Sequence, residues 1–582
     1  MRRGGVLLCV ALVLALGAFT LALGAPTLAY GAPASAYGAP ALAGGPSARA
    51  AGASATPTGN LLVLLQADQA RSAGVRASVA SAVRALGGRP AGRTVPEIGL
   101  LTVRPPAGVS ATAFAGLVEP IPGVAAVQSE LRYVPRALPD DPALSARDPV
   151  TGVHWQWYLA REGFYRAWRM DRGKRALVGV IDTGIDGSHP DLARKLAAAV
   201  DQQSPADSSG PPTTDQVGHG THVASLACAD TDNGIGLAGA GYDCRLVIEK
   251  TDFTDSSIAA AIVDATKRHV DALNMSFGPS GGTSNSAPRS ETRALHYALA
   301  HRVVLVAAAS DSPGTEQGDP ANVLQPAGTG PNMAKGIGLD VTSADYAGLR
   351  STFAGSGTEI SLAAYGSYRA SGNVLAPCSG KTFGLFGAFP ANATQMESFP
   401  PTACRLTFRG DNRYATIAGT SMAAPQVAAT AAMMRVLNPY ATVRDILGAL
   451  KRTARRPRSK GWTSDLGWGI LNAGAALDAV RRVDHLAPVA QLFAPKVVHR
   501  RSFVLRWKGH DQQRPGLIAS GIAYFELFGR SGHGRPALLA RTTRHSCRFT
   551  GLPGHRYVFW LIAVDRAGNR ERHAPHVTTL VA

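Results

Sequence analysis

Hydrophobic and polar positions follow three different patterns along the 582 residues. The first pattern covers residues 59–135, where short apolar runs alternate with longer stretches of mixed polarity. Apolar runs of that length predict strands, and the longer stretches predict helices. The predicted order is strand, helix, strand, helix, strand, at residues 61–65, 70–86, 99–103, 111–118 and 125–134. This order predicts a small α+β module of the split βαβ type.

The second pattern covers residues 136–483 and alternates apolar strands with helical stretches. The clearest predicted strands are residues 176–181, 245–248 and 303–307, and the clearest predicted helices are residues 257–268 and 290–300. Strand and helix in alternation predict an α/β domain with a mostly parallel sheet and helices on both faces. A polar, Pro-rich connector at residues 135–149 precedes this domain and contains Arg136 and Arg147 as exposed candidates for cleavage.

The third pattern covers residues 485–582 and consists of short β runs separated by Gly and Pro turns. The strongest predicted strands are residues 502–507, 523–529 and 556–564. About a hundred residues with this pattern predict an all-β sandwich.

The N-terminal segment has the features of a signal for export. Arg2 and Arg3 precede an apolar stretch that ends near residue 25. This predicts a signal peptide at residues 1–25, and an uncleaved membrane anchor is the less favoured alternative. Residues 26–58 are rich in Gly, Ala and Pro and predict a low-complexity spacer. We therefore expect a secreted protein.

The composition is basic, with 59 Lys and Arg against 40 Asp and Glu and a formal net charge of +19. Such a charge permits binding to nucleic acid or to anionic surfaces, and it also fits a GC-rich bacterial genome. The arginines are dispersed and no recognition motif for nucleic acid is present, so we expect no specific nucleic acid partner. The most basic run, residues 451–460, is interpreted as a solvated loop, with a docking patch for an anionic polymer as the alternative.

Six cysteines are present, and Cys9 falls in the predicted signal peptide. In an exported chain the others can form disulfides, and two local pairs are predicted, Cys228 with Cys244 and Cys378 with Cys404. Cys547 is then left over. No Cys/His cluster with zinc spacing is found in the sequence.

Three motifs in the middle domain carry candidate chemistry. They are Val180-Ile181-Asp182-Thr183-Gly184, Gly218-His219-Gly220-Thr221-His222-Val223-Ala224 and Gly419-Thr420-Ser421-Met422-Ala423-Ala424-Pro425. Taken alone, the first motif is explained by a turn-capping Asp and the third by an N-cap Ser. The two histidines of the second motif could suggest a metal site, but they lack the intervening Glu and a third ligand. Together they supply a carboxylate, an imidazole and a hydroxyl in the order Asp, His, Ser, which can activate a nucleophile.

On these motifs the middle domain resembles the subtilisin-like serine peptidases, from about residue 140 to residue 479. Further matching segments are Trp155-Gln156-Trp157, His189-Pro190-Asp191-Leu192, Leu273-Asn274-Met275-Ser276-Phe277-Gly278 and Gly467-Trp468-Gly469-Ile470-Leu471-Asn472-Ala473. The resemblance implies that Ser421 is the nucleophile, that His219 is general base and then acid, and that Asp182 fixes the imidazole tautomer.

The resemblance also implies the substrate and the role of the flanking domains. The substrate would be a protein or peptide in extended form, paired with the strand that includes Ser276, Phe277 and Gly278. Residues 59–135 resemble the inhibitory propeptide of the family, which acts as an intramolecular inhibitor and is cut off during activation. The sandwich resembles immunoglobulin or fibronectin type III modules of bacterial secreted enzymes, and we expect it to contact the cell envelope.

One position departs from the family pattern. The family usually supplies an Asn amide to the oxyanion hole, and here the stretch ends Ala309-Ser310-Asp311. An ionised carboxylate cannot donate a hydrogen bond, whereas a protonated one can. Asp311 is therefore a doubtful donor, and the Thr420 hydroxyl and the Ser421 N–H group are the remaining donors.

The chemistry of a Ser-His-Asp triad requires no cofactor. The resemblance implies a structural calcium ion, with Asp191 and Asn233 as ligands, because calcium prefers oxygen ligands. An ordinary Asn-Gly turn beside a solvated Asp is the alternative.

The sequence thus predicts a secreted serine endopeptidase that works through an acyl-enzyme. The competing hypothesis is a catalytically silent protein that uses the protease fold for binding at the cell envelope. Asp182, His219 and Ser421 favour the enzyme, and Asp311 favours the silent protein.

Overall fold

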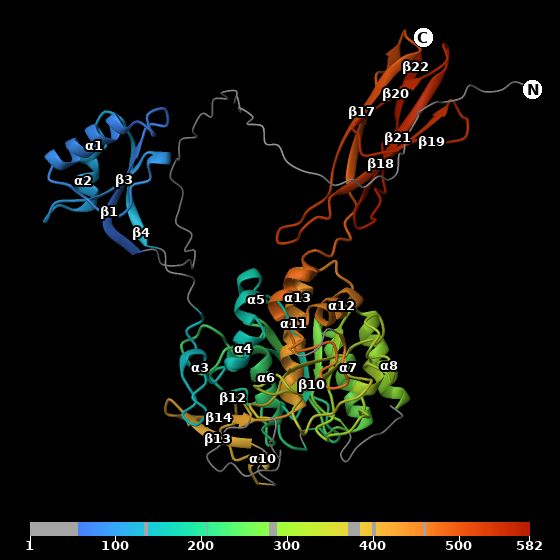
Figure 1. Cartoon of the computed structure of the whole chain (residues 1–582). Coiled ribbons are helices and arrows are strands. Elements are labelled where there is room, and N and C mark those ends of the chain that lie inside the picture. The colour runs from blue at the N-terminus through green and yellow to red at the C-terminus, as the bar shows by residue number, and fades with distance from the viewer. Residues whose placement is uncertain are drawn as a thin grey trace, which may run out of the picture. The chain divides into compact units, whose positions relative to one another are not determined.

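The computed structural model describes residues 56–132, 138–206, 208–278, 288–369, 384–398, 403–457 and 461–582. The chain divides into two compact units, one up to residue 138 and one from Pro139 onward, and each is described by itself (Figure 1). The predicted signal peptide and nearly all of the predicted spacer lie outside the described residues. Among the helices in these ranges, none is both long and apolar enough to cross a membrane.

The smaller unit is an antiparallel sheet with strand order β2-β3-β1-β4 and two helices. Its elements are β1 (Thr56–Leu65), α1 (Ala73–Ala85), β2 (Arg89–Pro90), the short helix η1 (Pro96–Ile98), β3 (Leu100–Arg104), α2 (Ala111–Val118) and β4 (Val124–Arg132). The hydroxyls of Ser72 and Ser110 cap the two α-helices. The predicted elements are all present, and the exposed two-residue strand β2 is added to them.

The larger unit is built on a seven-stranded parallel sheet, with strand order β11-β10-β9-β8-β5-β7-β6. These strands are β5 (Leu177–Asp182), β6 (Leu196–Asp201), β7 (Arg245–Lys250), β8 (Ala272–Met275), β9 (Val304–Ala308), β10 (Leu339–Ala344) and β11 (Leu362–Tyr365). The central strands read as continuous apolar runs because both of their faces are covered. The predicted α/β fold with a parallel sheet is confirmed.

Two sets of helices cover the two faces of this sheet (Figure 1). The helices α7 (Asp255–Lys267) and α8 (Arg289–Ala300) pack against one hydrophobic cluster, which includes Ile181 and Leu273. The helices α6 (His219–Cys228), α11 (Thr420–Leu437), α12 (Val443–Thr453) and α13 (Ala473–Val480) pack against the other cluster. Helices on both faces leave the carboxyl ends of the strands as the place for a site.

Helix α11 is the most deeply buried helix of the domain, and 17 of its 18 residues are buried. It packs against β8, β9 and β10. Its Ala-rich sequence allows this approach because small side chains keep the helix axis close to the sheet. Val436 of α11 is half-buried, and Ser421, Arg435 and Leu437 keep 8 to 9% of their surface exposed.

The remaining elements of the domain are short. They are α3 (Pro142–Ser145), α4 (Trp157–Arg161), α5 (Phe164–Met170), η2 (Ala193–Lys195), α9 (Ala321–Leu324) and α10 (Gln395–Ser398), and a second, antiparallel sheet of β12 (Leu385–Ala388), β14 (Asp411–Ile417) and β13 (Ala403–Phe408). This second sheet was not predicted. Helix α3 lies within the predicted connector at residues 135–149, and its residues Pro142, Ala143 and Leu144 are buried together with Asp141, so the prediction of a connector is wrong from Asp141 onward.

The interpretation of residues 451–460 as a solvated run is wrong at its first residue. Lys451 lies in α12 and is fully buried, and its ammonium group donates to Gln325 Oε1 at 2.7 Å. Burial lowers the pKa of Lys451 to about 8. Lys451 is therefore part of the core.

The C-terminal part is a β-sandwich of two sheets, with strand orders β15-β17-β20 and β16-β22-β21-β18-β19. Its strands are β15 (Val489–Phe493), β16 (Val497–Val498), β17 (Ser502–His510), β18 (Ile522–Ser531), β19 (Ala537–Thr542), β20 (Ser546–Thr550), β21 (Arg556–Asp565) and β22 (Val577–Val581). Aromatic side chains fill the space between the sheets, among them Trp507, Phe525 and Phe559.

One of the two predicted disulfides is present. Cys228 ends α6 and Cys244 precedes β7, and their sulfur atoms are bonded, with the Cα atoms 5.6 Å apart. Cys378 lies outside the described residues, so the pair with Cys404 stays a prediction. Cys547 is on β20.

Candidate active site

Asp182 and His219 meet where strand β5 ends and helix α6 begins. The Asp182 carboxylate is fully buried, and its Oδ1 atom lies 2.7 Å from His219 Nδ1. Gly220 makes this approach possible, because a Cβ atom there would lie 2.1 Å from the Gly184 carbonyl oxygen and 3.2 Å from Asp182. The Gly-His-Gly motif is therefore needed to bring the imidazole to the carboxylate.

Asp215 supports the same arrangement and was missed by the sequence analysis. Its buried carboxylate accepts hydrogen bonds from the Gly218 and Thr221 amides and from the hydroxyls of Thr183 and Thr221, at 2.7 to 2.9 Å. A carboxylate at the start of a helix is stabilised by the free amides and the helix dipole. Asp215 lies three residues before the N-cap Gly218, so the usual signal for a helix start, a polar residue directly before the helix, does not identify it.

The charge of His219 reflects several opposing influences. Removal from water lowers the pKa of its imidazole, but the carboxylates of Asp182, Asp215 and Asp311 outweigh this, so the pKa is raised above 6.5. His222, three residues on, is buried and its pKa is lowered to about 3 by burial. Its Nε2 atom lies 3.1 Å from the Leu385 carbonyl oxygen, so it is a helix residue as predicted.

Ser421 lies in the first turn of α11, beside the end of β8. Its hydroxyl donates to the Ser276 carbonyl at 3.2 Å, and the Ser276 hydroxyl donates to the Ser421 carbonyl at 3.1 Å. The second bond is possible because Pro425 has no N–H group and leaves the Ser421 carbonyl without its intrahelical partner. The proline of the third motif thus helps to tie the hydroxyl to the strand predicted to bind substrate.

A cavity of about 290 Å³ opens beside Ser421 between the ends of β8 and β9. Phe277 and Gly278 line one side, and Ala308 and Ala309 line the other. The segment after β8 is not paired with a neighbouring strand in the described part of the chain, so it can pair with an extended peptide. The structure therefore brings the predicted substrate strand and Ser421 to one cavity.

Asp311 and Thr420 line the same cavity. The Asp311 Oδ1 atom accepts a bond from the Thr420 amide at 2.8 Å and lies 3.0 Å from the Thr420 hydroxyl, which also lies 2.7 Å from the Ala309 carbonyl. The protein atoms around the carboxyl group raise the pKa of Asp311, although the residue is exposed to the cavity, while the bonds from Thr420 and the charge of His219 lower it, with a raised pKa as the result. Asp311 thus accepts hydrogen bonds from Thr420, the first residue of α11.

The family follows from a comparison with known proteins. Residues 173–469, which include Asp182, His219 and Ser421, match the model of the subtilase family, the S8 peptidases. The chain belongs to the subtilase family. The domain is therefore a subtilisin-like serine endopeptidase domain, as the motifs predicted.

Individual relatives are distant. Thermitase from Thermoactinomyces vulgaris is 26% identical over 321 residues, which cover 54% of this chain and 91% of thermitase. An extracellular protease from Xanthomonas campestris is 26% identical over 376 residues, which cover 58% of this chain and 57% of that protein. Among solved structures, a protease from Pseudoalteromonas arctica is 25% identical over 59% of this chain and 100% of that chain, with a TM-score of 0.44.

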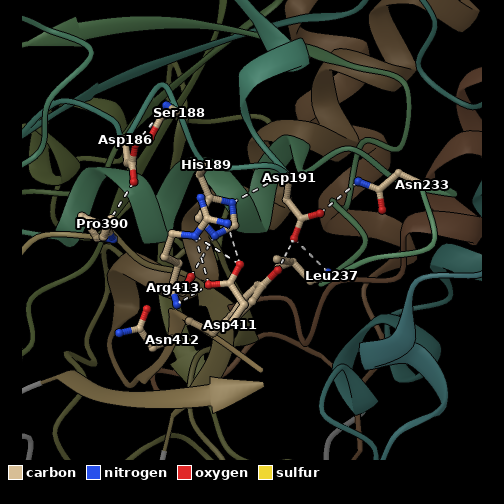
Figure 2. Close-up of polar contacts among 12 residues, drawn as sticks. Asp186, Ser188, His189, Asp191, Asn233, Leu237, Pro390, Asp411, Asn412 and Arg413 are labelled. Atoms are coloured by element: carbon tan, nitrogen blue, oxygen red, sulfur yellow. Dashed lines mark hydrogen bonds and ion pairs between the residues drawn. The ribbon is translucent and has the colours of Figure 1, made fainter. Parts of the chain in front are cut away.

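Asp191, a predicted calcium ligand, lies in a network of polar side chains (Figure 2). Its buried carboxylate accepts hydrogen bonds from the Asn233 amide at 3.0 Å, the Tyr414 hydroxyl at 3.1 Å and the Leu237 amide at 3.3 Å. Burial raises the pKa of Asp191 to about 7. The neighbouring His189 accepts from the Asp191 amide at 3.1 Å, and its pKa is lowered to about 4 by burial.

This arrangement does not fit a calcium ion. Calcium needs six to eight oxygen ligands, and here both carboxylate oxygens face hydrogen-bond donors instead. The Asn233 side chain presents its NH₂ group to Asp191, and its oxygen accepts from the Ile235 amide at 2.9 Å. These contacts do not support the calcium site at Asp191 and Asn233 that the resemblance implied, and no step of the chemistry below uses it.

Another acidic group lies outside the active site. Within the described ranges, Asp484, Asp511 and Asp565 are the three acidic side chains close enough to share an ion, with ligand atoms within 4.8 Å. They belong to the sandwich and its connection, and none lines the cavity beside Ser421.

The hydrogen bonds that the Asp191 carboxylate accepts lead to a testable prediction. We expect Tyr414→Phe to lower the free energy of unfolding by about 1 kcal/mol, because it leaves a buried carboxylate with one donor fewer. We also expect neither calcium nor EDTA to shift the melting temperature of the wild-type chain. Calorimetry measures both, with Tyr440→Phe as the matched control. A saturable rise of the melting temperature with calcium would contradict the prediction.

Proposed function

We propose that this protein hydrolyses peptide bonds with Ser421 as nucleophile, His219 as general base and Asp182 as the group that orients the imidazole. The observation that carries the proposal is the 2.7 Å contact between Asp182 and His219, together with Ser421 in the first turn of a buried helix beside an open cavity. The family match supports the same reaction class.

The first step is activation of Ser421. With His219 Nδ1 donating to Asp182, the Nε2 atom is unprotonated and can accept a proton. The Ser421 hydroxyl bonds to the Ser276 carbonyl here, so a rotation about its Cα–Cβ bond precedes proton transfer. Ser421 Oγ then attacks the scissile carbonyl carbon, and the imidazolium stabilised by Asp182 protonates the leaving amine.

The second step is hydrolysis of the acyl-enzyme. Water gives its proton to His219 Nε2 and attacks the ester carbonyl, and the proton returns to Ser421 as the product acid leaves. In both steps the negative oxygen needs donors. The Ser421 amide belongs to the first turn of α11, whose amides have no intrahelical partner. Asp311 contributes a donor only when it is protonated.

We expect Asp311→Asn to make the enzyme faster. Loss of one oxyanion-hole donor costs on the order of 10²- to 10³-fold in rate in this enzyme family, so an added amide should raise kcat by up to roughly that factor. It also removes a carboxylate that raises the pKa of His219. Because His219 must be neutral to act as base, the rising limb of the pH profile should move to lower pH.

Rates of wild type and Asp311→Asn on one peptide substrate, measured from pH 5 to pH 10, check both effects. Ser310→Asn serves as the matched control, because it introduces an amide one residue away. A slower Asp311→Asn variant, or an unmoved limb, would count against the assigned role of Asp311.

Secretion and activation extend the proposal. The predicted signal peptide, and a relative named as an extracellular protease, support export. The small α+β unit and the connector after it support a zymogen, in which residues 59–135 inhibit the catalytic domain until they are removed.

The test of the proposed function is processing of the secreted chain. Wild type should lose the N-terminal unit by cleavage near Pro135 and then hydrolyse casein, whereas Ser421→Ala should stay full length. The N-terminal sequence and intact mass measure this, and Ser276→Ala, which keeps the nucleophile, is the companion variant. If both wild type and Ser421→Ala stay full length and inert, the silent binding protein becomes the better hypothesis.

The sandwich supports contact with the anionic cell envelope. Residues 485–582 contain fifteen Lys and Arg against four Asp and Glu. Of these four carboxylates, Glu526, Asp565 and Glu571 are buried. Arg506, Lys508 and Arg548 are exposed on one face of the sheet β15-β17-β20, since they alternate with buried residues and Arg548 pairs opposite Val504.

We expect the full chain to sediment with purified bacterial envelopes at low salt and to be released at high salt, because surface charge contacts are screened. Changing Arg506, Lys508 and Arg548 together to Gln should weaken sedimentation at least tenfold. The same change at the exposed residues Lys267, Arg289 and Arg293 of the catalytic domain is the control. Equal losses in both triple variants would point to net charge rather than to this face.

A further inference from the structure

The cavity beside Ser421 is acidic although the chain as a whole is strongly basic. Three carboxyl side chains line it, from Asp311, Glu316 and Asp319, and none of its described lining residues is Lys, Arg or His. In a chain with 59 basic and 40 acidic residues, the cavity therefore has the charge opposite to that of the molecule. Carboxylates that line a concave site focus a negative potential within it.

The three carboxyl groups lie at different places. Asp311 is at the reacting end, bonded to Thr420. The Asp319 carboxyl is close enough to Glu291 on α8 to raise the pKa of that residue, so its charge also acts behind the cavity. Glu316 is exposed, and no ion pair or hydrogen bond of its side chain is found within the described ranges. Glu316 is thus the carboxylate available to a ligand.

The backbone that carries Glu316 is held firmly by its neighbour Gln317. The Gln317 side chain is fully buried, accepts from the Ser310 amide at 2.8 Å and donates to the Ser356 carbonyl at 2.8 Å. The Gln317 amide donates to Glu359 at 2.6 Å. These bonds join the loop after β9 into a closed turn, so Glu316 is held at the cavity without an induced change of the loop.

The walls of the cavity suit a long side chain. Phe277, Ala308 and Ala309 present apolar atoms between the Ser421 end and the acidic end. Gly278 contributes no side chain to the lining, and a Cβ atom there would meet the Asp319 carbonyl oxygen at an ordinary contact distance of 3.6 Å. Lys and Arg bury their methylene stems along apolar surface and extend the charged end to a polar partner.

We propose that this cavity is the subsite for a Lys or Arg side chain on the residue that supplies the scissile carbonyl, with Glu316 as its charge partner. Ser421 attacks the carbonyl of one substrate residue. Because Ser421 and Thr420 line the cavity, the side chain of that same residue is the one that can enter it. The proposal rests on the proposed peptidase function, and it adds the substrate class: chains with accessible basic residues. Arg136, which precedes the catalytic domain in the sequence, has that chemistry.

The test compares peptides that differ only at this residue: Arg, Lys, Leu and Glu. For the processed wild-type enzyme we expect kcat/KM for Arg and Lys to exceed that for Leu at least tenfold, with Glu lowest, and the preference to shrink as salt is added. A wild-type preference for Leu over Arg and Lys would overturn the proposal.

Two substitutions test whether Glu316 causes the preference for Arg and Lys. Glu316→Gln keeps the size and removes the charge, so we expect at least a tenfold loss for Arg and Lys and less than a twofold change for Leu. Glu316→Lys should invert the order and favour the Glu peptide. Asp255→Asn removes one exposed charge from the same domain outside the cavity lining and should leave all four values unchanged. Equal losses on all four peptides in Glu316→Gln would indicate a structural role and overturn the proposal.

A binding measurement separates this proposal from the proposed function. Product peptides that end in Arg or Leu are titrated into Ser421→Ala, with and without Glu316→Gln, and followed by calorimetry. Selective binding of the Arg peptide that is lost in the double variant supports the subsite even if the wild-type chain cleaves nothing, in which case the peptidase proposal alone fails. Equal binding of both peptides overturns the subsite.

Discussion

The burial of helix α11 against β8, β9 and β10 is the constraint on which the site depends. A helix that is apolar on all sides must be buried in the protein. Its first turn then lies at the carboxyl ends of the strands. There its amides meet Asp311, and its Ser421 carbonyl meets the Ser276 hydroxyl because Pro425 removes the intrahelical donor. The same packing that stabilises the domain thus sets the nucleophile beside the substrate strand.

Acidic groups are concentrated around this point in a basic molecule. Asp182 and Asp215 favour the protonated imidazole of His219, and Asp311 adds to them. This is useful when the imidazolium forms during the reaction, and it is unfavourable for the negative oxygen that forms at the same time. The negative charge of Asp311 therefore stabilises the imidazolium but destabilises the negative oxygen. The pKa of Asp311 is raised by the protein atoms around its carboxyl group, and at a pH where this carboxyl is protonated it can donate to that oxygen.

Burial also decides what Asp191 does. In the sequence it stands in a segment that resembles an oxygen-ligand site, whereas in the structure its oxygens receive donors from Asn233, Leu237 and Tyr414. Tyr414 comes from β14, a strand of the small antiparallel sheet that the sequence analysis did not predict. One hydrogen bond from this strand, together with those from Asn233 and Leu237, thus satisfies a carboxylate that would otherwise need a cation or a proton.

The sequence by itself determined the order of the domains, the strand and helix pattern of each, the family and the triad motifs. It could do so because periodicity and short motifs are local properties of the chain, as in the continuous apolar run of β5 and the Gly-His-Gly of α6. It could not reveal Asp215 as a partner of the α6 amides, Lys451 as a core residue or Glu316 as a cavity residue. Each of these depends on which distant segments meet: Glu316 lines a cavity with Phe277 and Ser421, from parts of the chain far apart in sequence. Only the tertiary structure decides such contacts, because packing, not local pattern, determines which charges are buried and which remain available to a substrate.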